Sequence, residues 1–148
     1  MAVRVSVTFI SLLLLLHSTL GIAVDFSYPA VFNFGDSNSD TGELVAGLGD
    51  SLALPYGENY FKTPAGRFSD GRLIIDFLMK AMDLPFLHPY LDSIGIPSFL
   101  KGCNFAAAGS TILPATTSSV SPFSFRIQVS QFLRFRQRVL ELQAQGTV

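Results

Sequence analysis

The sequence predicts an α/β fold, because two short apolar runs that suit buried strands alternate with two segments that have helical periodicity. Residues 30–34 form a mostly apolar run that ends in Gly35-Asp36, which is typical of a strand entering a turn. Residues 102–109 are small and apolar, and they suit a second strand followed by a tight turn. Helices are expected over 72–82 and 124–145.

The helix predicted over 72–82 has start and stop signals at its ends. Ser69 or Asp70 can cap its first turn, and Pro85 stops it. Its apolar residues recur at helical spacing and share one face; they are Ile74, Phe77, Leu78 and Ala81.

The helix predicted over 124–145 has an apolar stripe opposite a charged and polar one. The stripe consists of Val129, Phe132, Leu133, Val139 and Leu140. The remaining long segments are expected to be irregular. Residues 42–71 are rich in Gly, Pro and polar residues and predict a long surface excursion, and residues 110–122 are rich in Ser, Thr and Pro and predict a loop.

Residues 1–23 have the organisation of a secretory signal peptide. One positive charge precedes an apolar core of about a dozen residues, which is short of the ~20 that span a bilayer. Gly21 and Ala23 supply the small residues that signal peptidase requires. We therefore expect secretion, to the cell wall or apoplast if the source is a plant. Since no later run is comparable, no stable membrane anchor is expected after cleavage.

Composition excludes some kinds of partner. Residues 24–100 carry ten acids against four bases, and residues 101–148 carry five bases against one acid. Neither segment has the clustered basic density of a nucleic-acid surface, so no nucleic-acid partner is expected. The chain has 14 Phe, which predicts an aromatic-rich core, and one cysteine, Cys103, which is either buried or paired with a partner elsewhere.

The candidate chemistry follows the first predicted strand. Ser37 comes directly after Gly35-Asp36, where a hydroxyl can project from the carboxyl edge of a sheet, and open α/β sheets place their sites at that edge. Short runs of Gly, Asp and Ser are more often plain turns. The pattern is also not the Gly-x-Ser-x-Gly nucleophile elbow of α/β-hydrolases.

Four ordered motifs carry a resemblance to a known family. Residues 35–42 read GDSNSDTG; Leu54-Pro55-Tyr56-Gly57, the run 66–72 and then Asn104-Phe105-Ala106 with Gly109-Ser110 follow in the same order. Together they resemble the plant branch of the GDSL (SGNH) hydrolases, from about Pro29 to the end of the chain. Some members close to this pattern are described as early-nodulin-like or α-fucosidase-like.

The resemblance implies a serine hydrolase that acts on carboxylic esters of small molecules, such as lipid, acyl or acetyl esters, through an acyl-serine intermediate. The implied fold is a doubly wound parallel sheet sandwiched by helices, of which residues 24–148 would form the N-terminal portion. Ser37 would be the nucleophile, and the backbone N–H groups of Ser37 and Gly109 would form part of the oxyanion hole. Asp36 and Asp40 are expected to support the loop by accepting hydrogen bonds from backbone N–H groups. Neither a cofactor nor a metal is implied.

Two blocks of the family pattern are absent from this sequence. The Gly-x-Asn-Asp block, which supplies a third oxyanion donor, has no match, since Asn104 is followed by Phe105 and belongs to the second block. The Asp-x-x-His block, which supplies the base and its carboxylate, is also absent, since Pro85 stands three residues before His88. Only two strands are predicted, so the sheet is expected to be incomplete and the chain weakly active or inactive. Arg67 is expected to pair with one of the loop aspartates, Asp36, Asp40 or Asp70.

Two other functions stay open at this point. One is a non-catalytic secreted module, derived from the hydrolase, that binds a lipid, a glycan or a protein through a Phe-rich surface. The other is an anion-binding or phosphate-binding loop at residues 35–42, which the absence of lysine and the nearby acidic residues disfavour.

Overall fold

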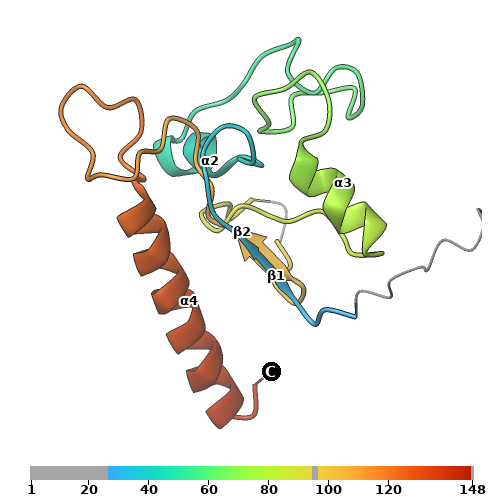
Figure 1. The fold of residues 1–148 in the computed structure, drawn as a ribbon. Coiled ribbons are helices and arrows are strands. Elements are labelled where there is room, and N and C mark those ends of the chain that lie inside the picture. The colour runs from blue at the N-terminus through green and yellow to red at the C-terminus, as the bar shows by residue number, and fades with distance from the viewer. Residues whose placement is uncertain (1–26, 95–96, 148) are drawn as a thin grey trace, which may run out of the picture.

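Two parallel strands lie between two helices in the computed structural model, which describes residues 27–94 and 97–147 (Figure 1). The predicted α/β class is confirmed, and within these ranges the sheet has two strands. The elements in chain order are β1 (Val31–Asn33), α2 (Glu43–Leu48), α3 (Ile74–Ala81), β2 (Gly102–Asn104) and α4 (Phe125–Ala144).

The strands pair in parallel, so their carboxyl ends meet at one edge of the sheet. Val31 lies opposite Gly102, and Asn33 lies opposite Asn104. The chain at residues 88–90 continues the pairing beyond β2, because the Asn104 N–H donates to the His88 carbonyl at 2.9 Å and the Tyr90 N–H donates to the Asn104 carbonyl at 2.9 Å. The turns that follow β1 and β2 therefore leave the sheet side by side.

One face of the sheet is covered by α4 through an aromatic cluster, as the Phe-rich composition predicts. The Phe132 ring lies 5.3 Å from that of Phe32, 5.7 Å from that of Phe34 and 5.9 Å from that of Phe105. Phe135, one turn further along, lies 5.7 Å from Phe32. Edge-to-face contacts at these distances are the arrangement that aromatic rings prefer.

The inward stripe of α4 is rotated from the predicted one. Leu133 is 55% exposed and Leu140 is 46% exposed. The side chains that face the sheet instead follow an i, i+4, i+7 series, with the buried Gln128 before Phe132 and Phe135. The sequence-based stripe was right at Phe132 but wrong in phase elsewhere, because it included Leu133 and Leu140 and left out Gln128 and Phe135.

The other face of the sheet is covered by α3. Val31 packs against a buried cluster made by Leu73, Ile75, Met79 and Leu87. The apolar face predicted for this helix points the other way, since Ile74 is 74% exposed and Phe77 and Leu78 are each 52% exposed. Both faces of α3 are apolar, and the helix buries the one that carries Met79.

The start of α3 also differs from the prediction. Neither Ser69 nor Asp70 caps the helix; instead the Asp76 carboxylate, in the first turn, accepts the Leu73 N–H at 2.9 Å. The same carboxylate receives Arg67, with its Nη2 at 2.6 Å and its Nε at 2.8 Å. The expected pairing of Arg67 with a loop aspartate was therefore wrong. A bidentate pair buried at this depth orients the 66–72 segment against α3.

The predicted surface excursion over 42–71 contains a short helix, α2, that the sequence analysis missed. The predicted loop over 110–122 has no regular element. The predicted signal peptide at 1–23 lies outside the described residues. In the part of the chain that the structure describes, no helix is both long and apolar enough to cross a membrane.

Candidate functional site

Ser37 opens the turn that follows β1. The Asp36 carbonyl closes this turn by accepting the Ser39 N–H at 3.1 Å and the Asp40 N–H at 2.9 Å. Ser37 is half-buried, and within the described ranges neither its Oγ nor its backbone N–H makes a hydrogen bond. Both groups are therefore available to a ligand at the carboxyl edge of the sheet.

Asp36 and Asp40 accept hydrogen bonds from backbone N–H groups around the turn. The Asp36 carboxylate accepts the Asn38 N–H at 2.9 Å. Asp40 is fully buried, and its carboxylate accepts three N–H groups at the start of α2: those of Gly42 at 2.7 Å, Glu43 at 2.6 Å and Leu44 at 3.3 Å. A carboxylate at a helix N-terminus both satisfies unpaired donors and complements the helix dipole.

Gly109 lies in the turn that follows β2. Its φ of +72° is a left-handed conformation that glycine adopts without strain, and an added Cβ would lie 2.9 Å from the Val120 Cβ. The turn is closed by the Ser110 N–H, which donates to the Ala107 carbonyl at 3.1 Å. Gly109 is exposed, and its N–H has no hydrogen-bond partner among the described residues.

Two hydrogen bonds join the Ser37 turn to the Gly109 turn. The Ala108 N–H donates to the second Asp40 carboxylate oxygen at 2.6 Å, and the Ala107 N–H donates to the Gly35 carbonyl at 3.2 Å. The fold therefore places the two segments that carry the candidate residues against each other. Asp40 makes four backbone contacts in all, and these span both segments.

A pocket of about 260 Å³ opens beside these two turns. Phe125 and residues 110–112 line one side of the pocket, and the turn that contains Ser37 contributes polar groups to the other side. Ser37 itself does not line the pocket. The lining residues are Gly35, Asp36, Ser39, Ser110, Thr111, Ile112, Phe125 and Gln128. Its position suits a small substituent of a ligand bound at the turns.

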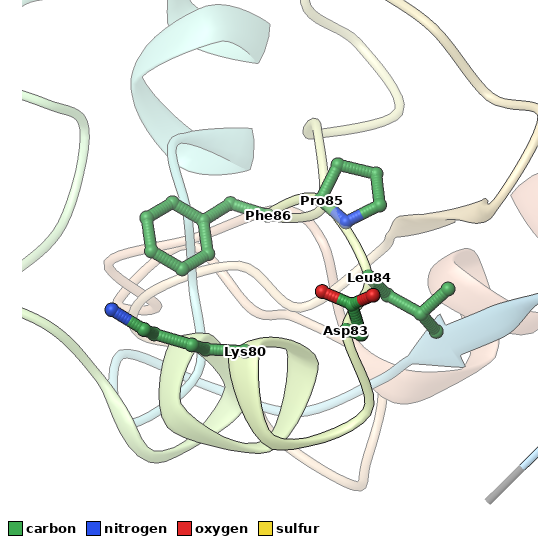
Figure 2. A pocket seen from close by; sticks show the side chains of 5 residues that line it. All are labelled: Lys80, Asp83, Leu84, Pro85 and Phe86. Carbon is green, nitrogen blue, oxygen red and sulfur yellow. The ribbon is translucent and has the colours of Figure 1, made fainter.

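A larger hollow of about 420 Å³ lies after the C-terminus of α3 (Figure 2). Lys80 and Asp83 lie on the helix side, and Leu84, Pro85 and Phe86 follow along the chain. None of the candidate site residues lines it. Among the described residues that line it there is no serine, histidine or cysteine for nucleophilic chemistry.

The buried charge beside the turn is carried by Asp40 and Glu43. Burial raises the pKa of Asp40, and its four backbone hydrogen bonds oppose this change. Burial, followed by the nearby Asp40 charge, raises the pKa of Glu43 to about 7. The Glu43 carboxylate accepts the Leu91 N–H at 2.8 Å and the Gln131 Nε2 at 3.0 Å, which links α2 to α4.

Comparison with known proteins identifies the family of this chain. A family model described as GDSL-like lipase/acylhydrolase matches residues 31–146. The chain belongs to this family. Two GDSL esterase/lipases of Arabidopsis thaliana are 71% identical over 120 residues and 59% identical over 116 residues, and they are matched over 81% and 78% of this chain. Alpha-L-fucosidase 3 of the same plant is 46% identical over 125 residues, which is 82% of this chain.

The chain spans about 30% of the length of these GDSL relatives, since the matches cover 29%, 31% and 33% of them. No solved structure matches the chain significantly.

Asn104 is used for structure in this GDSL chain. It is fully buried, and its Nδ2 donates to the Ser39 carbonyl at 2.6 Å and to the Thr41 hydroxyl at 2.9 Å. Its Oδ1 accepts the Asn33 Nδ2 at 2.8 Å and the Ala106 N–H at 3.0 Å. With both hydrogens and the oxygen occupied, the side chain has no donor left for an oxyanion.

His88 and Cys103 do not join the site. The His88 side chain is exposed on the segment beside β2. Cys103 is fully buried with a free thiol, and burial, together with the Glu43 charge, raises its pKa to about 12. A thiol that stays protonated and buried is not a nucleophile. In the described ranges no group of His, Cys, Asp and Glu could hold a metal ion.

Sequence reasoning missed two residues that hold the site. Glu43 and Gln128 are both buried and both polar. The signal for Gln128 was its position four residues before Phe132 and seven before Phe135, because a polar residue in phase with an inward aromatic stripe is a candidate for a buried hydrogen bond. Glu43 follows the GDSNSDTG run directly, and no periodic signal marks it.

Proposed function

We propose that this GDSL chain forms the nucleophile and oxyanion part of a serine esterase that acts on carboxylic esters of small molecules. The observation that supports the proposal is the junction of the two turns through Asp40 and Gly35, because it holds the segments that carry Ser37 and Gly109 against each other at the carboxyl edge of the sheet. The proposed complete fold is a doubly wound parallel sheet of the SGNH type, of which β1 and β2 are two neighbouring strands.

The proposed chemistry has two steps. The Ser37 Oγ attacks the ester carbonyl as its proton passes to a base, and the resulting tetrahedral oxyanion accepts hydrogen bonds from the free N–H groups of Ser37 and Gly109. The carbon–oxygen bond to the alcohol then breaks, and the alcohol leaves with a proton from the protonated base. Water then attacks the acyl-serine carbonyl as its proton passes to the base, and the Ser37 oxygen leaves with a proton from that base as the acid is released.

The base and the third oxyanion donor are the groups that this sequence does not supply, because no Asp-x-x-His or Gly-x-Asn-Asp run occurs in it. Loss of a triad member costs ~10⁴-fold or more in rate. Loss of one oxyanion donor costs a further ~10²–10³-fold. We therefore expect feeble hydrolysis by the 148-residue chain alone.

Extracellular location is part of the same proposal, with residues 1–23 acting as the signal peptide. The residues support it, since the apolar core is flanked by one positive charge and by the small pair Gly21 and Ala23. Secretion would place the site among cell-wall and surface esters, which are candidate substrates.

The test uses two proteins. In the first, residues 31–146 replace the matching part of the 71%-identical Arabidopsis relative, so that the remaining length of that enzyme is present. A fluorophosphonate should label this chimera, and Ser37→Ala should abolish both labelling and hydrolysis of p-nitrophenyl butyrate. Ser39→Ala is the matched control for the nucleophile, because the Ser39 Oγ makes no hydrogen bond within the described ranges, and this variant should keep fluorophosphonate labelling.

The second protein is the 148-residue chain, whose hydrolysis rate should match that of its own Ser37→Ala variant. Labelling of the chimera that survives Ser37→Ala would disprove the nucleophile assignment. An unlabelled chimera that binds lipid or glycan would instead support a binding module derived from the hydrolase.

A further inference from the structure

Gln128 is the buried side chain that touches both turns of the candidate site. It is 1% exposed and lies in the first turn of α4, 93 positions from Gly35 and 18 from Ser110 in sequence. Its Oε1 accepts the Gly35 N–H at 3.0 Å, and its Nε2 donates to the Gly35 carbonyl at 2.8 Å. One amide thus holds both backbone groups of the residue two positions before Ser37.

The same amide reaches the second turn. The Gln128 Nε2 donates to the Ser110 Oγ at 2.8 Å and lies 3.2 Å from the Phe123 carbonyl. Ser110 directly follows Gly109, and its hydroxyl donates in turn to the Phe123 carbonyl. Gln128 therefore connects the chain before the nucleophile to the chain after the oxyanion glycine.

The position of Gln128 is itself fixed by α4. Phe132 and Phe135 lie one and two turns further along the same face and pack against the aromatic residues of the sheet. An amide on a helix anchored in this way has little freedom to follow a moving loop. Gly35 has no side chain and a φ of +155°, so the backbone there depends on outside contacts for its orientation.

We infer that Gln128 is a positioning residue, which sets the distance between the Ser37 turn and the Gly109 turn so that nucleophile and oxyanion donor face one substrate carbonyl. The inference rests on the proposed function, because that function gives the two positioned groups their roles as nucleophile and oxyanion donor. The physical reason for its importance is that an error of about 1 Å in the placement of reacting groups costs ~10²-fold in rate.

The test measures hydrogen exchange in the full 148-residue chain, which makes it independent of hydrolysis. Gln128→Ala should lower the protection of the Gly35 amide by at least about tenfold and should also lower protection across 108–112. Gln131→Ala is the matched control, since Gln131 has the same side chain one turn along α4 but contacts Glu43. That variant should leave the protection at Gly35 unchanged.

A conservative variant separates positioning from general stability and guards against misfolding of Gln128→Ala. In Gln128→Glu, a carboxylate at pH 8 keeps an acceptor for the Gly35 N–H but has no proton to donate to Ser110 or to the Gly35 carbonyl. Burial favours the neutral acid, so acidification to pH 5 should restore one donor. Protection at 108–112, corrected for intrinsic exchange and expressed relative to the parent chain at the same pH, should therefore recover at pH 5 in this variant.

Three results would overturn the inference: unchanged protection in Gln128→Ala, an equal loss in Gln131→Ala, or a loss in Gln128→Glu that is the same at both pH values. A failure of Ser37 to react in the chimera would instead refute the proposed function and leave these exchange results unaffected.

Discussion

Buried carboxylates are the residues on which this site depends most. Asp40 and Glu43 are both fully buried and stand within one helical turn of each other. The Asp40 carboxylate accepts hydrogen bonds from four backbone N–H groups, whereas the Glu43 carboxylate accepts one from a backbone N–H group and one from a side-chain amide. Because fewer hydrogen bonds offset the burial of the Glu43 carboxylate, its pKa rises into the neutral range, to about 7.

The first prediction concerns stability and pH. The pKa of Glu43 is about 7 in the folded chain against a usual 4.5, so between these values the folded state binds more protons than the unfolded state. The free energy of unfolding should therefore fall as pH rises through this window and level off above it, by about 3 kcal/mol at most. Urea denaturation at pH 5 and pH 8 measures the change.

Glu43→Gln is the control for this prediction. The amide keeps an acceptor for the Leu91 N–H and does not titrate, so the variant should lack most of the slope while still retaining that of Asp40. A variant with the same pH dependence as the parent chain would show that Glu43 is not the group responsible.

Residue chemistry was partly predictable from the sequence. Ser37 and Gly109 are named by their motifs, and the structure brings their segments together. Glu43 and Gln128 were not predictable in the same way, because a buried polar side chain is identified by its partners. Those partners lie 48 and 93 positions away in the chain, at Leu91 and Gly35. Local pattern can mark Gln128 as a candidate for burial, but it does not identify a partner at that separation.

At the scale of elements, the pairing of β1 with β2 depends on Gly102. Its φ is +100°, and an added Cβ would lie 1.7 Å from the Val31 carbonyl oxygen, which is backbone and cannot move aside. Gly102→Ala should therefore separate the strands and lower the free energy of unfolding by more than about 3 kcal/mol.

A second glycine provides the comparison. Gly49 has a similar left-handed φ of +69°, but no atom of the described residues lies within 4 Å of an added Cβ, so Gly49→Ala should cost only about 1–2 kcal/mol. Thermal unfolding followed by circular dichroism distinguishes the two. Equal losses would mean that backbone conformation, and not the close approach to Val31, sets the requirement for glycine at 102.

Helix α3 gives a third prediction, since its observed burial is opposite to the sequence-based face. Met79 is fully buried and Ile74 is 74% exposed. Met79→Ala should cost about 2–5 kcal/mol, and Ile74→Ala should change stability by no more than about 0.5 kcal/mol. Chemical denaturation of both variants measures the difference. The reverse order would show that the helix is rotated.

The positions of the helices along the chain were predicted better than the faces that they bury. The predicted 124–145 helix is present at 125–144, and the predicted 72–82 helix is present in shortened form. Which face is buried was wrong for α3 because both of its faces are apolar. It was wrong in phase for α4 because Gln128 interrupts the apolar pattern of the inward face.

At the scale of the whole molecule, export is the remaining prediction. Cleavage after Ala23 should leave Val24 as the first residue of the secreted protein, because Gly21 and Ala23 meet the small-residue requirement. Intact-mass measurement of protein from the medium of a eukaryotic secretion host checks the site. Membrane-bound protein that retains Leu12–Leu16 would show that the segment is an anchor.

The contact between Gly35 and Gln128 can form only after α4 has been synthesised. The two residues are 93 positions apart, and a ribosome adds about 5–20 residues per second, so roughly 5–20 s pass between synthesis of the turn and synthesis of its partner. During that interval the nascent chain presents Phe32 and Phe34 without the α4 rings that later cover them. Chaperone binding to the first strand during translation is the expected result.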